Sequence, residues 1–232
     1  MAITSEAESA DSTLASSPCM LHELGPDGAP RVDPQQATDV ARWRKAERER
    51  LMSGRMALAS DMRAAQTLAM VRDLDSLVAS AHSSLVSVYW PIRGEPDLRA
   101  WMHALAGRGV RVALPVAVAL GQPLIFREWR PHVRLTRGLW NIPYPADGAE
   151  VVPSIVVAPM VGFDRECYRL GYGGGFFDRT LGVISPKPVA IGVGYPGALL
   201  RTIFPQPYDI PMDWIVTGMS APLRRAQLAA SR

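Results

Sequence analysis

The sequence is poor in cysteine and has no long apolar run. Its 232 residues include only Cys19 and Cys167, which lie far apart and outside any CxxC pattern. We therefore expect neither a disulfide framework nor a thiolate metal site, and we predict a reducing, cytoplasmic location. No apolar stretch approaches the roughly 20 residues that span a bilayer, and the first residues lack the basic start and apolar core of a secretory signal. A membrane partner is not expected.

The sequence also lacks a large excess of either positive or negative charge. The formal net charge is +3, and 20% of the residues are charged. A nucleic-acid partner usually leaves a concentrated basic stripe, so none is expected. The charge could attract an anionic small molecule, but ordinary solubility explains it better. The sequence leaves the oligomeric state open, with a monomer favoured.

Residues 1–37 are rich in Ala, Ser, Gly, Pro and Asp and show no sustained apolar period, which predicts a flexible N-terminal extension. A single domain is expected to cover residues 38–232. Its first helix is predicted to begin near Asp39 and to continue to about residue 81, because leucine and methionine recur at three- and four-residue spacing. A short helix should follow Pro96 and end at Gly107 or Gly109.

Apolar and β-branched runs predict the strands of the domain. The predicted strands cover residues 84–90, 110–116, 123–129, 154–163, 189–195 and 214–218. Several of these runs are continuously apolar, which favours strands that are buried on both faces. Strands flanked by helices in this way predict a three-layer α/β/α fold with a largely parallel sheet.

The segment RLGYGGGFFDRTL, residues 169–181, carries the strongest signal for chemistry. Its glycines let backbone N–H groups turn toward one point, and the helix-forming FFDRTL would direct its positive end to the same point. Arg169 and Arg179 could neutralise charge, and Asp178 could hold a Mg²⁺ that bridges phosphates. A glycine run alone is more often a tight turn, but these flanking charges favour a phosphate site.

Two other phosphate motifs can be set aside. The P-loop pattern GxxxxGK[ST] is absent. GVGYPG, at residues 192–197, matches GxGxxG and follows a predicted strand. A dinucleotide site, however, needs an acidic residue at the end of the next strand, whereas Asp209 and Asp213 precede that strand.

PMVGFD followed by RLGYGGGFFDR resembles the signature of the 5-formyltetrahydrofolate cyclo-ligases, also called methenyltetrahydrofolate synthetases. The resemblance covers roughly residues 42–218 and includes RWRKAERERL, YWPIRGEPD, Leu114-Pro115 and YDIPMDWIVT, in that order. It implies an enzyme that converts 5-formyltetrahydrofolate and ATP to 5,10-methenyltetrahydrofolate, ADP and phosphate with Mg²⁺. In the implied mechanism, the formyl oxygen attacks the γ-phosphate, N10 attacks the activated carbon, and phosphate departs.

The resemblance also implies roles for individual residues. Arg169 and Asp178 would be catalytic, and Asp178 and Asp209 would hold Mg²⁺. The residues implied to bind ATP are Arg44, Lys45, Arg48, Arg169, Leu170, Gly171, Tyr172, Gly173, Gly174, Gly175, Phe176 and Phe177. The residues implied to bind the folate are Trp90, Glu95, Tyr144, Tyr172 and Phe176.

Several of these assignments compete with a structural explanation. The basic residues of the first helix could form a solvated face, and Lys45 competes with Arg44, which replaces the lysine usual in the family. Glu95 could be an acid at the entry to a helix, and Trp90 a core aromatic. Asp209 lies between prolines, where a turn residue is common.

The chain departs from the family pattern at aromatic residues, namely Tyr144 in place of an acid, Phe177 in place of tyrosine and Tyr208 in place of histidine. These departures keep two alternatives open. One is a noncatalytic paralogue that binds nucleotide or folate, and the other is ATP-dependent ring closure on a related formamide-like metabolite. The joint presence of Arg169, Asp178 and Asp209 favours an enzyme.

Overall fold

The computed structural model describes residues 34–81 and 85–226, so most of the predicted extension lies outside the described residues. The chain divides into two units, Met1–Ala46 and Glu47–Arg232, and each is described by itself. Helix α1 (Pro34–Ala57) begins before the predicted start near Asp39. A proline suits the first turn of a helix, where its missing N–H has no intrahelical partner to lose. The domain boundary after residue 37 stays a prediction.

The long helix predicted to run to residue 81 is two helices. Helix α1 ends at Ala57 and α2 (Ser60–Ser80) follows, with Ala59 in an extended conformation at φ −60° and ψ 148°. The Arg63 guanidinium donates to the carbonyl oxygen of Leu58 at 3.0 Å, which satisfies an acceptor left free by the break. The prediction of one continuous helix was wrong because the apolar spacing continues across the break and does not reveal it.

The second unit is built on a seven-stranded sheet with the order β11-β10-β9-β6-β1-β2-β3. Its strands are β1 (Leu85–Ser87), β2 (Arg111–Val116), β3 (Ile125–Trp129), β6 (Ile155–Pro159), β9 (Val189–Val193), β10 (Trp214–Val216) and β11 (Leu223–Arg224). The five inner strands pair in parallel, and the edge strands β3 and β11 are antiparallel to their neighbours. The predicted largely parallel sheet is confirmed.

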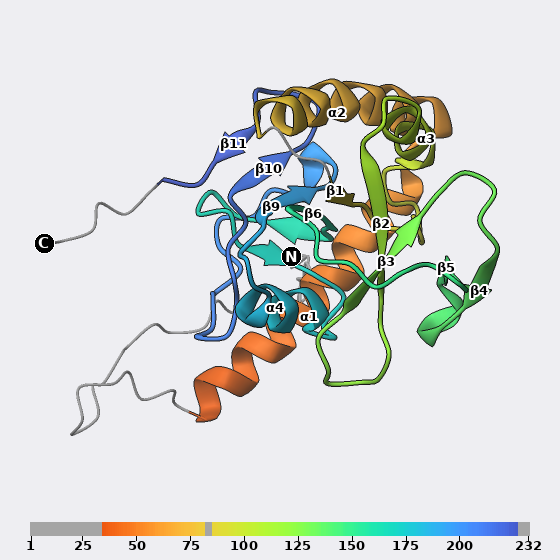
Figure 1. Cartoon of the computed structure of the whole chain (residues 1–232). Helices are drawn as coiled ribbons and strands as arrows, with labels where there is room; N and C mark the ends of the chain where they lie inside the picture. Colours follow the sequence, from red (N-terminus) through yellow and green to blue (C-terminus); the bar gives the residue numbers. More distant parts are fainter. Residues whose placement is uncertain (1–33, 82–84, 227–232) are drawn as a thin grey trace, which may run out of the picture. The chain divides into compact units, whose positions relative to one another are not determined.

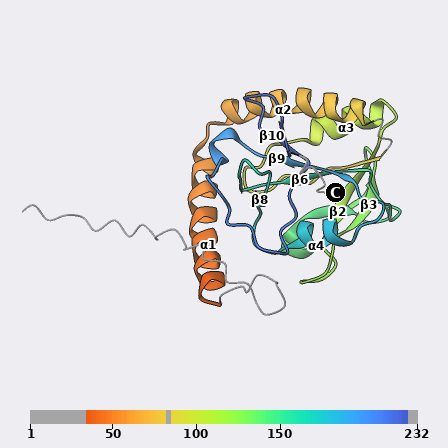
Figure 2. The same cartoon turned by 90° about the vertical axis from the view of Figure 1, so that its left-hand side faces the viewer.

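Helices cover both faces of this sheet. Helices α2 and α3 (Arg99–Gly107) lie on one face, and α4 (Phe176–Val183) lies on the other (Figures 1 and 2). Met70 and Leu74 of α2 and Leu105 of α3 are fully buried in the core cluster that they share with the central strands. The predicted three-layer α/β/α arrangement is therefore confirmed. In the described part of the chain, no helix is both long and apolar enough to cross a membrane.

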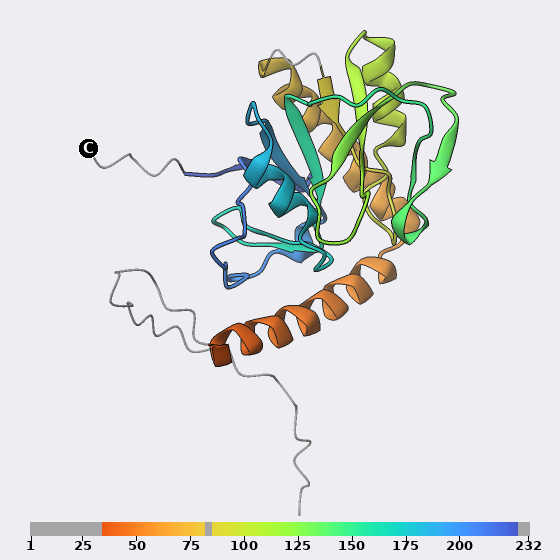
Figure 3. The ribbon, with the colours of Figure 1, turned by 60° about the horizontal axis from the view of Figure 1, so that its bottom comes forward.

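Short elements at the ends of the strands complete the second unit. The predicted strand over residues 154–163 is interrupted, because β6 ends at Pro159, which lacks the N–H that a ladder needs, and β7 (Gly162–Phe163) pairs instead with β8 (Arg169–Leu170). A ribbon of β4 (Leu135–Arg137) and β5 (Pro143–Pro145), joined through the short helix η1 (Leu139–Asn141), extends beyond the β3 edge (Figure 3). A second short helix, η2 (Pro196–Ala198), follows β9.

The topology brings two of the predicted site segments together. Strands β1 and β6 are parallel neighbours, so their carboxyl ends meet at one edge of the sheet. The segment that carries Glu95 follows β1, and the segment that carries the glycine-rich sequence follows β6. Ligands of α/β sheets bind at this edge.

Candidate functional site

The glycine-rich loop, residues 171–175, joins β8 to α4. Gly173 has a φ of 96° and Gly175 a φ of 65°, so both adopt the left-handed region that favours glycine. Gly175 is the N-cap of α4, and no side chain caps this helix end. The positive end of α4 therefore remains available to an anion.

Arginine side chains occupy the space that the missing glycine side chains leave. A Cβ atom on Gly171 would lie 2.6 Å from Nη1 of Arg169, and one on Gly175 would lie 2.8 Å from Nη1 of Arg179. The Arg179 guanidinium also donates a hydrogen bond to the carbonyl oxygen of Gly174. Positive charge thus lies directly against the loop backbone, as a phosphate site requires.

A third arginine reaches the loop from α1. Nε of Arg48 donates to the carbonyl oxygen of Gly171 at 2.7 Å, and its Cζ lies 3.4 Å from the position of a Cβ on Gly173. The structure therefore brings Arg48 to the predicted loop. Arg44 and Lys45 belong to the other unit, so their roles stay predictions.

Asp178 and Arg169 form a buried ion pair at the base of the loop. Nη2 of Arg169 lies 3.0 Å from Oδ2 of Asp178, and their side chains are 5% and 17% exposed. The other carboxylate oxygen accepts a hydrogen bond from the backbone N–H of Ile210 at 3.3 Å. Nε of Arg169 is buried with no hydrogen-bond partner among the described residues. A buried donor of this kind indicates a group whose acceptor comes from a ligand or water.

Asp209 directly precedes Ile210, the residue whose N–H bonds Asp178. Its Oδ2 accepts a hydrogen bond from the backbone N–H of Gln206 at 2.7 Å, and its own N–H donates to the carbonyl oxygen of Gln206 at 2.9 Å. The turn explanation for Asp209 is thus confirmed. Its predicted role with Asp178 at a metal ion stays a prediction.

Glu95 is almost completely buried and belongs to a hydrogen-bonded network. Its Oε2 accepts from the backbone N–H of Ile92 at 2.9 Å, and its Oε1 accepts from the hydroxyl of Tyr172 at 2.8 Å. That hydroxyl in turn accepts from Nη2 of Arg55 at 2.6 Å. Burial raises the pKa of the Glu95 carboxyl, and the hydrogen bonds from Ile92 and Tyr172 partly offset this rise.

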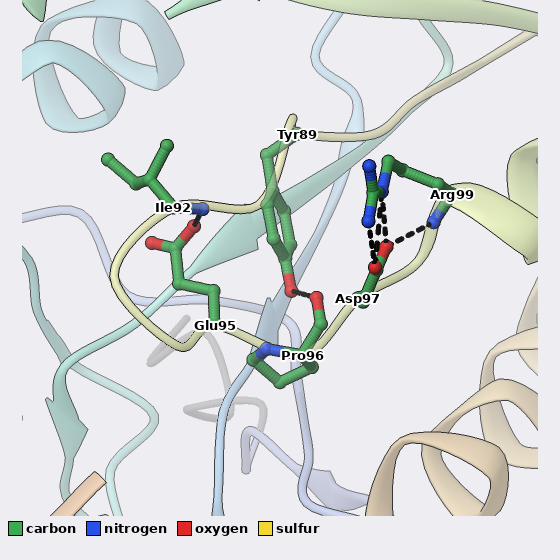
Figure 4. Close-up of polar contacts among 6 residues, drawn as sticks. All are labelled: Tyr89, Ile92, Glu95, Pro96, Asp97 and Arg99. Atoms are coloured by element: carbon green, nitrogen blue, oxygen red, sulfur yellow. Dashed lines mark hydrogen bonds and ion pairs between the residues drawn. The ribbon is translucent and has the colours of Figure 1, made fainter. Parts of the chain in front are cut away.

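Glu95 is not the acid at the entry to a helix. Helix α3 begins at Arg99, and its backbone N–H donates to Oδ1 of Asp97 at 3.1 Å. Figure 4 shows the Glu95 carboxyl turned toward Ile92, whereas Asp97 faces Arg99. Asp97 therefore serves the helix, and the role of Glu95 in folate binding stays a prediction.

The aromatic residues predicted to line the site make different contacts. The rings of Phe176 and Trp140 meet edge to face, with centroids 5.2 Å apart, and the Arg169 guanidinium lies 5.0 Å from the ring of Phe177. Tyr144, on β5, contacts the guanidinium of Arg127 instead, at 5.5 Å. The structure thus brings Phe176 and Phe177 to the loop.

Trp90 is partly buried and packs against the main hydrophobic core. The guanidinium of Arg99 lies 5.7 Å from its ring. These contacts agree with the core explanation for Trp90. Its role in folate binding stays a prediction.

Sequence reasoning missed two residues of this region. Arg55 lies in the helix predicted from the spacing of leucine and methionine and was given no role, although a charged residue at a position that should be buried is a signal of a polar network. Trp140 has a left-handed φ of 54° and is 56% exposed beside the loop. A large aromatic that is both strained and exposed suggests a functional constraint, but the sequence shows neither property.

Comparisons with known proteins give a consistent result. Residues 40–218 match the model of the 5-formyltetrahydrofolate cyclo-ligase family. The chain is 33% identical over 140 residues to the 5-formyltetrahydrofolate cyclo-ligase of Mycolicibacterium smegmatis, covering 57% of this chain and 72% of the relative. It is 32% identical over 147 residues to that of Escherichia coli, covering 60% and 80%. The structure of Aquifex aeolicus 5,10-methenyltetrahydrofolate synthetase superposes with a TM-score of 0.70 at 25% identity, covering 82% of this chain and 96% of that one.

Proposed function

The chain belongs to the 5-formyltetrahydrofolate cyclo-ligase family, and we propose that it closes 5-formyltetrahydrofolate to 5,10-methenyltetrahydrofolate with ATP and Mg²⁺, releasing ADP and phosphate. One observation carries the proposal. Tyr172 belongs to the glycine-rich loop, the candidate phosphate site, and its hydroxyl bonds Glu95, the candidate folate contact, at 2.8 Å. A reaction that moves a phosphoryl group onto a folate needs these two sites to adjoin. A cytoplasmic monomer completes the proposal.

The proposed reaction turns a poor leaving group into a good one. The formyl oxygen attacks the γ-phosphorus, and the bond from that phosphorus to ADP breaks. N10 then attacks the formyl carbon, loses its proton, and displaces phosphate together with the former formyl oxygen. The protein has to align the oxygen with the phosphorus and to stabilise the charge on the moving group.

The residues around the loop suit a triphosphate. Arg48, Arg169 and Arg179 place guanidinium groups against the loop backbone, and Nε of Arg169 is a buried donor without a partner in the described chain. A side chain at Gly171 or Gly175 would fill the space that these groups occupy. In the proposed complex, the arginines bind the phosphate oxygens and hold the γ-phosphate toward the folate.

The carboxylates suit Mg²⁺. Asp178 and Asp209 offer the hard oxygen donors that this ion prefers, and the N–H of Ile210 joins their two segments by bonding Asp178. No group of three or more metal-ligating His, Cys, Asp or Glu side chains occurs within residues 34–81 and 85–226. Mg²⁺ does not require one, because it commonly binds one or two carboxylates together with phosphates and water. When bound, it supplies neutralising charge for phosphoryl transfer.

The test is an absorbance assay on the full-length protein. Purified protein mixed with 5-formyltetrahydrofolate, ATP and Mg²⁺ is expected to generate the methenyl chromophore, and omission of ATP or chelation of Mg²⁺ should abolish it. Release of one ADP for each methenyl group formed would link the nucleotide to ring closure. Protein that binds ATP and folate but never produces the chromophore would instead be a noncatalytic paralogue. Consumption of ATP with another formamide but not with the folate would identify a different substrate.

Substitution of Gly173 by alanine is expected to weaken ATP binding. A φ of 96° lies outside the range that alanine tolerates, so the loop must shift or carry strain of about 1–3 kcal/mol. Since 1.4 kcal/mol corresponds to a factor of ten, the dissociation constant for ATP should rise by about tenfold or more, as measured by titration calorimetry.

Gly182 offers the matched control for this substitution. It lies in α4, and nothing lies within 4 Å of the position that its Cβ would take. Gly182→Ala should keep wild-type ATP affinity and should raise the free energy of unfolding by about 0.5–1 kcal/mol. Unchanged ATP binding in Gly173→Ala would show that the loop conformation is not needed for the nucleotide.

A further inference from the structure

Arg55 is a buried cation that the proposed reaction leaves without a role. Its side chain belongs to α1 and the residue is only 7% exposed. Nη2 donates to the Tyr172 hydroxyl at 2.6 Å, but Nε and Nη1 are buried and have no hydrogen-bond partner among the described residues. Burying a guanidinium with most of its donors unused costs folding free energy. Such a residue is poorly explained as a contributor to stability.

The charge of Arg55 is directed at Glu95 through a single hydroxyl. Tyr172 accepts from Arg55 and donates to Oε1 of Glu95, so the three groups form one chain. Oε2 of Glu95 is fixed separately by the N–H of Ile92 at 2.9 Å. The carboxylate is thus held at both oxygens. The position of Oε1 depends on the Tyr172 hydroxyl, which Arg55 holds in place.

We infer that Arg55 is a positioning residue of the proposed cyclo-ligase reaction, which, through the Tyr172 hydroxyl, keeps the Glu95 carboxylate ionised and oriented to receive the folate. The inference rests on the proposed function. The pterin ring presents a ring N–H beside an amino group, and an ionised carboxylate is the acceptor that matches such a pair of donors. A protonated carboxyl would present a donor to one of them.

The groups around Glu95 determine the sign of the effect. Burial raises the pKa of the Glu95 carboxyl, whereas the cations Arg55 and Arg93 lower it. The titratable and charged groups that act on Glu95 come from α1, from its own loop, from the glycine-rich loop and from the ends of β1 and β9: Arg55, Arg93, Tyr172, Tyr89 and Tyr195. The pKa values of the three tyrosines are raised, so they remain neutral at ordinary pH. Loss of Arg55 removes one of only two cations in this set, and the Glu95 pKa should rise further.

The experiment compares Arg55→Met with the wild-type protein across pH. As the pH is lowered, the dissociation constant for 5-formyltetrahydrofolate should begin to rise at a pH about one unit higher in Arg55→Met than in the wild type. At lower pH values the variant should bind the folate about tenfold more weakly than the wild type does. The affinity for ATP should be unchanged. The melting temperature should be unchanged or higher. A merely structural role would instead lower the melting temperature and weaken both ligands without moving the pH dependence.

Further variants separate the charge from the hydroxyl. Tyr172→Phe removes the hydroxyl that links Arg55 to Glu95 and should move the pH dependence in the same direction. The double variant should move it somewhat further, because the direct effect of the Arg55 charge on Glu95 is then lost as well. Arg55→Lys keeps the charge and should restore most of the wild-type profile. Arg50→Met is the matched control, because Arg50 lies on the same helix but is exposed and paired with Glu47. An Arg55→Met profile that coincides with the wild type would overturn the inference.

A ligand-free measurement keeps this test independent of the proposed function. The Glu95 carboxyl can be titrated by NMR in protein labelled at the glutamate side chains, with Glu95→Gln to assign the signal. Its pKa should rise in Arg55→Met and not in Arg50→Met. If the wild type never closes the folate but this rise is seen, the proposed function fails while the coupling between Arg55 and Glu95 stands. If the wild type is active and no rise is seen, only the inference fails.

Discussion

Asp178→Asn is expected to reduce the turnover number by about a hundredfold to a thousandfold, with ATP still bound. The substitution keeps the shape of the side chain but removes the charge that pairs with Arg169 and that would hold Mg²⁺. In the proposed reaction, both losses act on the charge that develops during phosphoryl transfer, so the turnover number should fall more than the affinities. Steady-state methenyl formation at saturating folate and ATP measures the effect.

Asp213 supplies the matched control. Its Oδ2 accepts from the backbone N–H of Ala190 at 2.8 Å, so Asp213→Asn removes an aspartate that is also bonded to the backbone but lies outside the proposed site. Its turnover number should stay close to that of the wild type. If Asp178→Asn kept a turnover number as high as that of Asp213→Asn, a catalytic role for Asp178 would be excluded.

The stability of the pair can be separated from its chemistry. Asp178→Ala leaves the Arg169 guanidinium buried and unpaired, which should lower the free energy of unfolding by about 3–5 kcal/mol. The double variant Arg169→Met/Asp178→Leu replaces the ion pair by apolar side chains and should recover most of this loss. It should remain inactive. Recovery of activity along with stability would mean that the pair serves only the fold.

Glu95→Gln is expected to raise the dissociation constant for 5-formyltetrahydrofolate by about a hundredfold and to leave ATP binding nearly intact. The amide retains the size of the side chain, but its NH₂ group must face either the N–H of Ile92 or the donors of the folate. Leaving a buried donor or acceptor unpaired costs about 1–3 kcal/mol, and a hundredfold change in the dissociation constant lies near the upper end of this range. Separate calorimetric titrations with folate and ATP measure the two affinities.

The pH dependence gives this prediction a second measurement. Burial raises the pKa of the Glu95 carboxyl in the folded protein, so wild-type folate affinity should fall as pH decreases through that pKa, and the glutamine variant should lack this decrease. A carboxyl with a raised pKa binds its proton more tightly when folded, and stability is therefore lost as pH rises through that pKa. The variant should not share this loss. The control is Asp97→Asn, at an exposed neighbour that pairs with Arg99. Equal loss of folate and ATP binding would show that Glu95 lies in another site.

Much of the fold could be predicted because it depends on local patterns. Continuous apolar runs identified the parallel strands, and the glycine-rich sequence identified a loop between a strand and a helix. Breaks inside regular patterns could not be predicted in the same way. The extended conformation at Ala59 and the end of β6 at Pro159 interrupt segments whose apolar residues continue on both sides.

The site was predictable only where its residues are close in sequence. Arg169 and Asp178 are nine positions apart, so one segment indicated both residues, although their ion pair was not predicted. Arg55 and Tyr172 are separated by 117 positions, and Tyr172 and Glu95 by 77. No spacing rule relates such residues. The parallel pairing of β1 with β6 brings the segments of Tyr172 and Glu95 together, and Arg55 reaches them from α1.

Tyr172 stands in the loop proposed for one substrate while its hydroxyl supports the acceptor proposed for the other. Under the proposed function, the two substrates therefore compete for, or jointly fix, the position of a single side chain. Thermodynamic linkage then requires reciprocity: whatever factor bound nucleotide applies to the folate dissociation constant, bound folate applies to that of the nucleotide.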